Sequence, residues 1–146
     1  MITIVIWLHL AATLYLLGLI CCIQVVHYPL MNRVDGDRFV EFHHQHGVRI
    51  SVVVVAPMVI ELVSAAVLAV WVPDGVEPAL PTVGLVLVVA IWLSTFAIQV
   101  PFHRQLAAGF DEAAHRRLVR SNWLRTIAWL ARGVLAVLIA IRFTAN

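Results

Sequence analysis

Four long apolar stretches, separated by three polar connections, dominate the sequence. The stretches comprise residues 3–27, 48–72, 80–102 and 123–142. A helix needs about 20 apolar residues to cross roughly 30 Å of hydrocarbon, and each stretch is long enough to do so. None carries the polar face that a helix of a soluble bundle would turn to water. The pattern predicts an all-α fold, a polytopic membrane four-helix bundle in up-down-up-down order, with one domain over residues 1–146.

The composition agrees with this prediction and narrows the functional classes. Hydrophobic residues make up 62% of the chain and charged residues 12%, with a mean hydropathy of +0.96. In soluble domains, by contrast, roughly a quarter of the residues are charged. The sequence contains no phosphate-binding loop, no dinucleotide-binding fingerprint and no haem-attachment motif. We therefore expect the lipid bilayer as a partner, and no nucleic acid.

The charges predict an orientation in the membrane. Most arginines fall in or beside the connections 28–47 and 103–122. The only charged residues of the connection 73–79 are acidic, Asp74 and Glu77. Arginine-rich loops tend to stay in the cytoplasm. We therefore expect a multi-pass protein of a bacterial inner membrane, with the two arginine-rich connections in the cytoplasm and both termini outside.

Local signals refine the ends of the spans. Asp35 or Asp37 ahead of span two, and Asp111 ahead of span four, are typical helix N-caps. They predict that both helices begin well before the membrane. Tyr28 and Trp123 lie where an aromatic belt is expected at the inner interface.

A shift of the sequence by 76 residues superposes span one on span three and span two on span four. We therefore consider a parallel two-span duplication as a hypothesis, with matched polar residues facing each other across the bundle. The matched pairs are His27 with His103, Asp35 with Asp111, His46 with Asn122, and Arg49 with Arg125.

Histidines gather where the spans meet the cytoplasmic side, here called the inner mouth. His43 and His46 are spaced i, i+3 on one face of the second helix, whereas His44 points elsewhere. His27 and His103 end the first and third spans. Neutral imidazole suits zinc, copper and iron, so His27, His46 and His103 are candidate metal ligands. The same histidines are also compatible with a role as polar caps at the interface, and haem, a transition metal or no cofactor at all remain alternatives.

Several polar residues lie inside the apolar stretches, where charge is costly and is a functional hypothesis by default. Glu61 and Arg132 occupy depths that permit an ion pair between spans two and four, and His9 could join them. This group predicts either a structural bridge or a route for ions or protons. Gln99 stands four residues before His103, so its amide could orient the imidazole or bond across helices.

Three short motifs surround the inner mouth: His46-x-x-Arg49, Pro101-Phe-His103-x-x-Leu106 and Asn122-Trp123-x-Arg125. With these motifs the chain resembles, over nearly its whole length, the small four-span membrane proteins of the anthrone-oxygenase-like family. The resemblance implies oxidation of a lipophilic, often aromatic substrate by oxygen, in a site formed by His46, His103, Asn122 and Arg125. In that family a histidine more usually stands in the place of Asn122.

A second likeness is to the haem-binding membrane protoporphyrinogen oxidases, and it rests on His9 early in span one. The lysine that such proteins carry on a later span has no counterpart, because this chain contains no lysine.

Three classes of function follow from these observations. The first is a membrane oxidoreductase or cofactor protein that admits a flat lipophilic molecule from the bilayer. In it the histidines would bind a metal, haem or substrate oxygen, and Arg49 and Arg125 would stabilise negative charge. The second is a small transporter that uses Glu61, Arg132 and His9, for which four spans would require a homo-oligomer. The third is a non-catalytic accessory subunit. We take the first as the working hypothesis.

Overall fold

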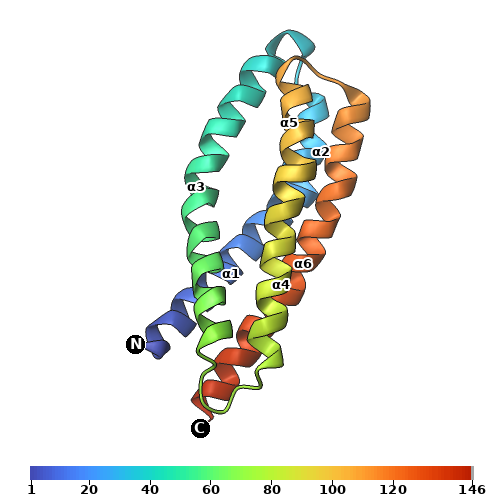
Figure 1. The fold of residues 1–146 in the computed structure, drawn as a ribbon. Helices are drawn as coiled ribbons and strands as arrows, with labels where there is room; N and C mark the ends of the chain where they lie inside the picture. The colour runs from blue at the N-terminus through green and yellow to red at the C-terminus, as the bar shows by residue number, and fades with distance from the viewer. Residues whose placement is uncertain (146) are drawn as a thin grey trace.

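Four long helical segments, joined by three short connections, make up residues 1–145, which are the residues that this computed structural model describes (Figure 1). The first segment runs through α1 (Ile2–Cys22), the π-helical turn η1 (Ile23–His27), α2 (Tyr28–Leu30) and the 3-10 turn η2 (Met31–Arg33). The second is a single helix, α3 (Gly36–Val70). The third comprises α4 (Ala79–Ser94), the π-helical turn η3 (Thr95–Gln99) and α5 (Val100–Ala107), and the fourth is α6 (Glu112–Thr144).

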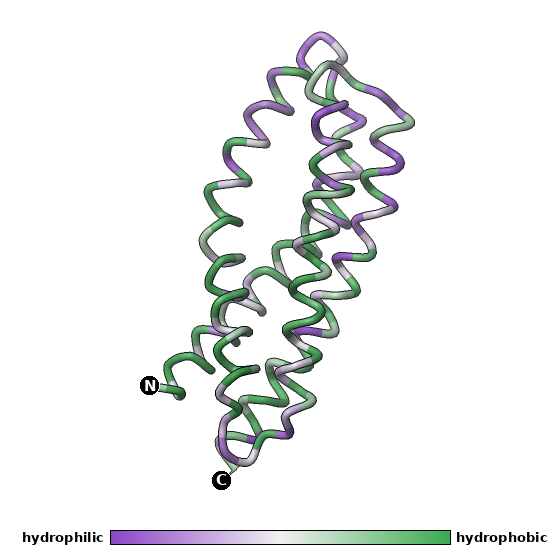
Figure 2. Tube along the Cα trace, viewed as in Figure 1, coloured by the Kyte–Doolittle hydropathy of each residue, from purple (hydrophilic) through white to green (hydrophobic). Residues whose placement is uncertain are grey.

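Each segment is long and apolar enough to cross a membrane, and the predicted membrane four-helix bundle is confirmed. The helices α3 and α6 contain 35 and 33 residues and are therefore about 50 Å long, more than the roughly 30 Å of hydrocarbon requires. Their extra turns are hydrophilic and lie at the end of the bundle opposite the termini (Figure 2). We call this end, which holds Arg33, Arg38, Arg104 and Arg116, the arginine-rich end.

The predicted helix starts are confirmed. Asp111 is the N-cap of α6, and its side chain accepts a hydrogen bond of 2.8 Å from the backbone N–H of Ala114. Asp35 is the N-cap of α3, but its side chain makes no capping bond. Both helices therefore begin well before residues 48 and 123, where the apolar stretches start.

The packing places each helix between two neighbours. α1 packs against α3 and α6 on one side of the bundle, and α4 packs against the same two helices on the other side, so α3 and α6 lie diagonally opposite each other. In the view of Figure 1, α3 is separated from α4 and α5 along the middle of the bundle and approaches the other segments again at the arginine-rich end, where Phe39 is fully buried. Three groups of buried residues stack along the bundle, centred on Phe39 and Leu118, on Leu16 and Trp129, and on Leu68.

The two π-helical turns share a cause in the sequence. η1 ends two residues before Pro29, and η3 ends two residues before Pro101. Proline has no backbone N–H, and its ring crowds the carbonyl four residues earlier. One extra residue in the preceding turn relieves this conflict. In η1 the N–H of Tyr28 accordingly bonds to the carbonyl of Ile23, five residues back.

The extra residue in η1 changes the direction of the side chains that follow. Tyr28 is 4% exposed and faces the interior of the bundle. The aromatic-belt prediction for Tyr28 is therefore wrong, whereas Trp123 is 47% exposed on the outer surface as expected.

The contact between α1 and α6 depends on Gly133, where a Cβ atom would come within 2.8 Å of the Leu17 side chain. We expect Gly133→Leu to lower the free energy of unfolding by about 1–3 kcal/mol through overpacking. Thermal unfolding in mild detergent, followed by circular dichroism, measures this loss. The control is Gly18→Leu on α1, because Gly18 has open space around its Cβ position. Equal stability of the two variants would contradict this account of the interface.

Candidate functional site

A cavity of about 290 Å³ lies between α3 and the third helical segment, in the half of the bundle nearer the arginine-rich end. Its deep part is apolar and includes Met58 and Trp92. Most of its polar groups lie at the end nearer the arginine-rich end and belong to Tyr28, Gln99, His46, His103 and Arg125. An apolar chamber with a few convergent polar groups is the usual form of a site for a small organic molecule.

The cavity opens sideways, between α3 and η3. Ser51 and Val55 of α3 and Phe96 of η3 line it and are also exposed on the outer surface of the bundle. Phe96 is 61% exposed. Because these segments are apolar enough to lie in hydrocarbon, the opening faces the region that lipid would occupy.

Two histidines and a tyrosine form a hydrogen-bonded chain that starts at this cavity. The hydroxyl of Tyr28 lies 3.0 Å from Nε2 of His103. Nδ1 of His103 lies 3.1 Å from Nε2 of His43. Tyr28 and His103 line the cavity, whereas His43 is buried behind them and its ring stacks on that of Phe39.

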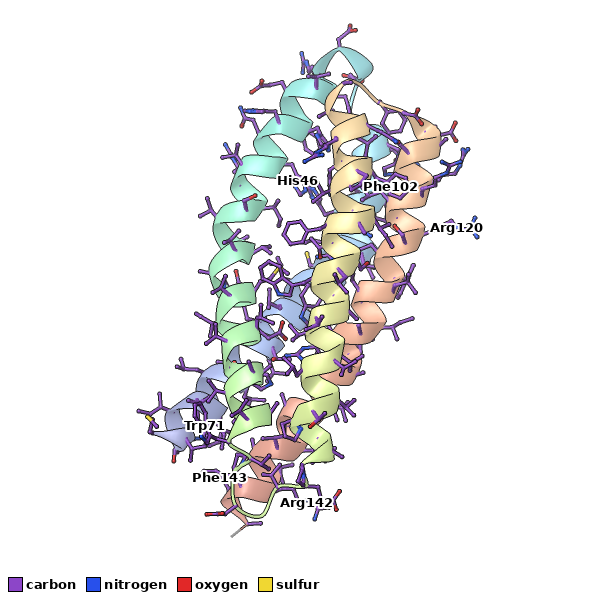
Figure 3. All side chains as sticks on the ribbon, viewed as in Figure 1. His46, Trp71, Phe102, Arg120, Arg142 and Phe143 are labelled. Carbon is purple, nitrogen blue, oxygen red and sulfur yellow. The ribbon has the colours of Figure 1, made fainter. Side chains whose placement is uncertain are left out.

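His46 forms the wall between two cavities. It lines the cavity described above and also a second one of about 520 Å³, which lies between α1 and α3. Its ring stacks on that of His27 with 4.3 Å between the ring centres. Figure 3 shows His46 on the side of α3 that faces α5. Its ring nitrogens form no hydrogen bond with another residue in the range 1–145, so in the neutral ring one nitrogen is free to accept a hydrogen bond and the other to donate one.

Arg125 is the buried cation of the site, at 8% exposure. Its Nη1 donates to Oδ1 of Asn122 at 2.9 Å, and Nδ2 of Asn122 donates to Oε1 of Gln24 at 2.7 Å. The guanidinium also lies beside the Tyr28 hydroxyl and 5.2 Å from the centre of the Trp129 ring. These contacts fix the direction of the side chain towards the cavity.

The charge of Arg125 is not balanced by a carboxylate. Within residues 1–145 neither of the two ion pairs includes it, and its Nε has no hydrogen-bond partner. A buried charge without a counterion is unfavourable, and in a membrane segment such a group is a functional candidate.

Glu61 and Arg132 form a second polar group, nearer the termini. Nε of Arg132 donates to Oε1 of Glu61 at 2.8 Å, and Nε1 of Trp129 donates to Oε2 at 3.1 Å. Nη1 of Arg132 donates to the carbonyl of Gly84 on α4. Both residues are at most 1% exposed. This ion pair joins the diagonally opposed helices α3 and α6, as the predicted structural bridge requires.

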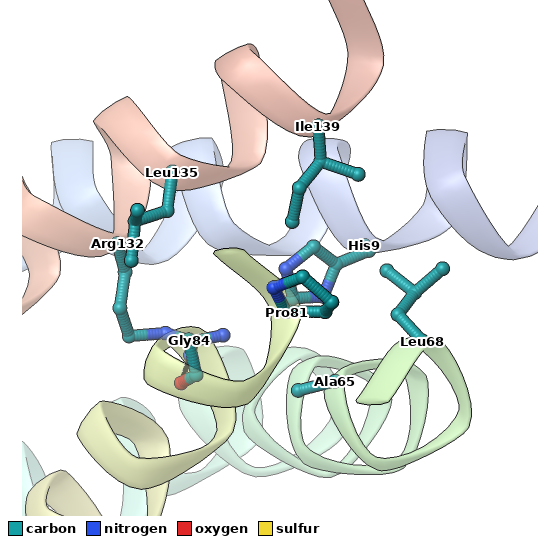
Figure 4. Close-up of a pocket in the computed structure, with 8 residues that line it drawn as sticks. All are labelled: His9, Ala65, Leu68, Pro81, Gly84, Arg132, Leu135 and Ile139. Atoms are coloured by element: carbon teal, nitrogen blue, oxygen red, sulfur yellow. Dashed lines mark hydrogen bonds between the residues drawn. The ribbon is translucent and has the colours of Figure 1, made fainter. Parts of the chain in front are cut away.

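His9 extends this group to α1, so that all four helical segments take part. Its Nδ1 lies 2.9 Å from the Ser64 hydroxyl. The Ser64 hydroxyl also lies within hydrogen-bonding distance of the carbonyls of Ile60 and Glu61 on its own helix. His9 and Arg132 lie on either side of a narrow space next to Gly84 (Figure 4). Every helix of the bundle thus contributes to the polar group, and its groups bond mainly to one another.

The candidate residues from the sequence fall into three places. His46, His103, Arg125 and Gln99 line the lateral cavity, and Asn122 holds Arg125 from behind. His27 and Arg49 line the second cavity. The third place is the Glu61–Arg132 group with His9.

The predicted metal centre of His27, His46 and His103 finds no support. Within the described range 1–145, no group of three or more histidine, cysteine, aspartate or glutamate side chains could hold a metal ion. The rings of His27 and His46 instead stack on each other, and Nδ1 of His103 is engaged by His43.

The remaining amides bond across helices instead of orienting imidazoles. Gln99 donates from Nε2 to the Ser121 hydroxyl on α6 at 3.1 Å, not to His103.

The residues matched by the proposed duplication also differ in surroundings. Arg49 is exposed and bonds to Gln45 on its own helix, whereas its counterpart Arg125 is buried.

Comparison with protein-family models, with curated proteins and with solved structures finds no match to this chain. The function must therefore be argued from the site itself.

Sequence reasoning missed two residues of the site. The aromatic-belt pattern predicts Tyr28 at the membrane interface, and only the proline at the next position signals the altered turn before it. The sequence predicts His43 on the same helix face as His46 but does not distinguish it as a site residue. Its spacing of three residues from His46 was the available signal.

We expect the Glu61–Arg132 ion pair to contribute strongly to the stability of the bundle. We expect Glu61→Gln to lower the free energy of unfolding by about 3–5 kcal/mol, because it leaves Arg132 charged and unpaired in the interior. The double variant Glu61→Leu/Arg132→Met should recover most of this loss. Glu112→Gln, which breaks an exposed ion pair with Arg116, is the control and should cost less than about 1 kcal/mol. Denaturation in mixed detergent micelles measures the free energy of unfolding of all three variants. If Glu61→Gln leaves it unchanged, the ion pair is not needed for stability.

Proposed function

We propose that this protein binds a lipophilic molecule with an oxygen-bearing polar group, which enters the lateral cavity from the bilayer. One observation carries the proposal. Arg125 is a buried cation without a carboxylate partner in residues 1–145, and it lies at the polar end of a cavity that opens towards the lipid-facing surface. A ligand oxygen with negative or partial negative charge would supply the missing partner.

The lining of the cavity fits such a ligand. A flat apolar ring system would lie against Met58 and Trp92. Its oxygen would lie near Arg125, where the imidazole of His46 and the hydroxyl of Tyr28 offer further hydrogen bonds. Entry between α3 and η3 would let the ring system move from lipid to cavity without crossing water.

We further propose that the arginine-rich end lies in the cytoplasm and both termini lie outside, since arginine-rich connections are retained on the inner side of a membrane. The polar end of the cavity would then lie in the inner half of the bilayer.

Binding can be tested with alizarin (1,2-dihydroxyanthraquinone), a flat lipophilic phenol whose colour reports its ionisation. With protein in lipid nanodiscs, we expect saturable quenching of tryptophan fluorescence. Arg125→Met should weaken the affinity about tenfold or more, because a hydrogen bond to a charged group is lost. Arg120→Met removes an exposed arginine of the same helix and should leave the affinity unchanged. Equal affinities for both variants and the wild type would contradict a role for Arg125.

The resemblance to the anthrone-oxygenase-like family adds a reaction to this proposal. An anthrone and one molecule of oxygen give the anthraquinone and one molecule of water. The reaction begins when a base removes a proton from the ring carbon, and the free ring nitrogens of His46 make it the candidate base. Arg125 would stabilise the negative charge that develops on the ring oxygen.

The reaction is tested with 1,8-dihydroxyanthrone in oxygenated buffer, after subtraction of the spontaneous oxidation. We expect the protein to accelerate formation of the anthraquinone, as measured by its visible absorption. His46→Phe should abolish most of the acceleration, whereas His44→Phe at the exposed neighbouring position should not. If anthraquinone forms at the spontaneous rate although the anthrone binds, the protein is a binding protein and not an oxygenase.

A further inference from the structure

The chain Tyr28–His103–His43 connects the cavity with the arginine-rich end through two hydrogen bonds, of 3.0 Å and 3.1 Å. The bound-ligand proposal does not require His43, which does not line the cavity. All three side chains can both donate and accept a proton at the atoms that face each other. Such an arrangement is a wire along which a proton can pass by successive short transfers.

We propose that this chain carries protons between the phenolic oxygen of a bound ligand and the arginine-rich end of the bundle. The inference rests on the proposed function, because it needs a ligand with an ionisable O–H group in the cavity.

The transfers balance as follows. The ligand O–H passes its proton to the Tyr28 oxygen while the Tyr28 hydroxyl passes its own proton to Nε2 of His103. The proton on Nδ1 of His103 moves to Nε2 of His43, and the proton on Nδ1 of His43 leaves to water. Tyr28 is unchanged, both histidines have exchanged one neutral tautomer for the other, and the ligand has become an anion. No oxidant or reductant is involved, and the reverse sequence returns the proton.

The surroundings of the three side chains favour proton transfer from the cavity to the arginine-rich end. At the cavity end, Arg125 lies beside the Tyr28 hydroxyl and would stabilise the ligand anion. At the other end, Nδ1 of His43 has no hydrogen-bond partner in residues 1–145 and is not fully enclosed. It can therefore exchange with water at the arginine-rich end.

The other titratable groups around the chain do not form a competing route. His46 of α3 and His27 of η1 pack against each other ring to ring. His46 also lies near His103, with 6.0 Å between ring centres, but no hydrogen bond joins the two within the described range. On α6, Arg125 is the charged group nearest the chain, and His115 bonds to the backbone carbonyl of Tyr28 instead of its hydroxyl.

The test uses bound alizarin as its own indicator. Protein in nanodiscs is loaded with alizarin and mixed rapidly with buffer of higher pH, and the colour change reports loss of the phenolic proton. We expect His43→Phe to slow this step at least about tenfold while leaving the equilibrium affinity for alizarin nearly unchanged. Tyr28→Phe should slow it similarly, although its affinity can also change because Tyr28 lines the cavity. His44→Phe is the matched control and should exchange at the wild-type rate.

The outcomes separate the two proposals. If wild-type protein fails to bind alizarin saturably, the proposed function itself is wrong. If alizarin binds but His43→Phe and Tyr28→Phe both lose the proton at the wild-type rate, the proton chain is overturned and the binding proposal stands. If His43→Phe is poorly folded by circular dichroism, Tyr28→Phe decides the question, because it keeps the ring and removes only the hydroxyl.

Discussion

The balance of charge on α6 determines much of this structure. Two buried arginines, Arg125 and Arg132, lie seven residues apart and therefore about two turns apart on one face of the helix. In hydrocarbon each needs a partner of opposite charge or a set of acceptors. Arg132 has both, since Glu61 and the Gly84 carbonyl accept its hydrogen bonds. Arg125 has the amide oxygen of Asn122, the hydroxyl of Tyr28 and the face of the Trp129 ring, but no carboxylate among residues 1–145. Arg132 therefore links the helices of the bundle, whereas Arg125 lacks a counterion in the described part of the chain, which is the basis of the ligand proposal.

This contrast agrees with the shape of the bundle. The ion pair holds α3 across the core to α6, and His9 with Ser64 ties α1 to α3 at a similar depth. Nearer the arginine-rich end α3 is held by the hydrogen bond between His43 and His103 and by the fully buried Phe39. The two cavities that share His46 lie on either side of His46. The polar groups of the lateral cavity are nevertheless well positioned, because they are held by α6 and by the segments around the two π-helical turns. Packed levels of the bundle therefore lie on both sides of the cavities along the helix axis.

The parts of this arrangement that depend on length, depth and apolar character could be predicted from the sequence. The four spans and the early starts of α3 and α6 followed from apolar runs and from Asp35 and Asp111. The ion pair of Glu61 with Arg132 followed from a rise of 1.5 Å per residue. Directions of side chains could not be predicted as well. The π-helical turn before Pro29 turns Tyr28 inwards, and a regular helix would not have indicated this. The separation of exposed Arg49 from buried Arg125 depends on how α3 packs, which no local pattern specifies.

The central claim is that the lateral cavity, and not the outer surface, receives the lipophilic ligand. Fluorine NMR of protein labelled with 5-fluorotryptophan tests it without any substitution, because Trp92 lines the cavity whereas Trp7 and Trp71 are exposed on the outer surface. Titration with alizarin in nanodiscs should shift the Trp92 resonance saturably and leave those of Trp7 and Trp71 in place. A shift of the surface tryptophans alone, or no saturable shift at Trp92, would contradict the account.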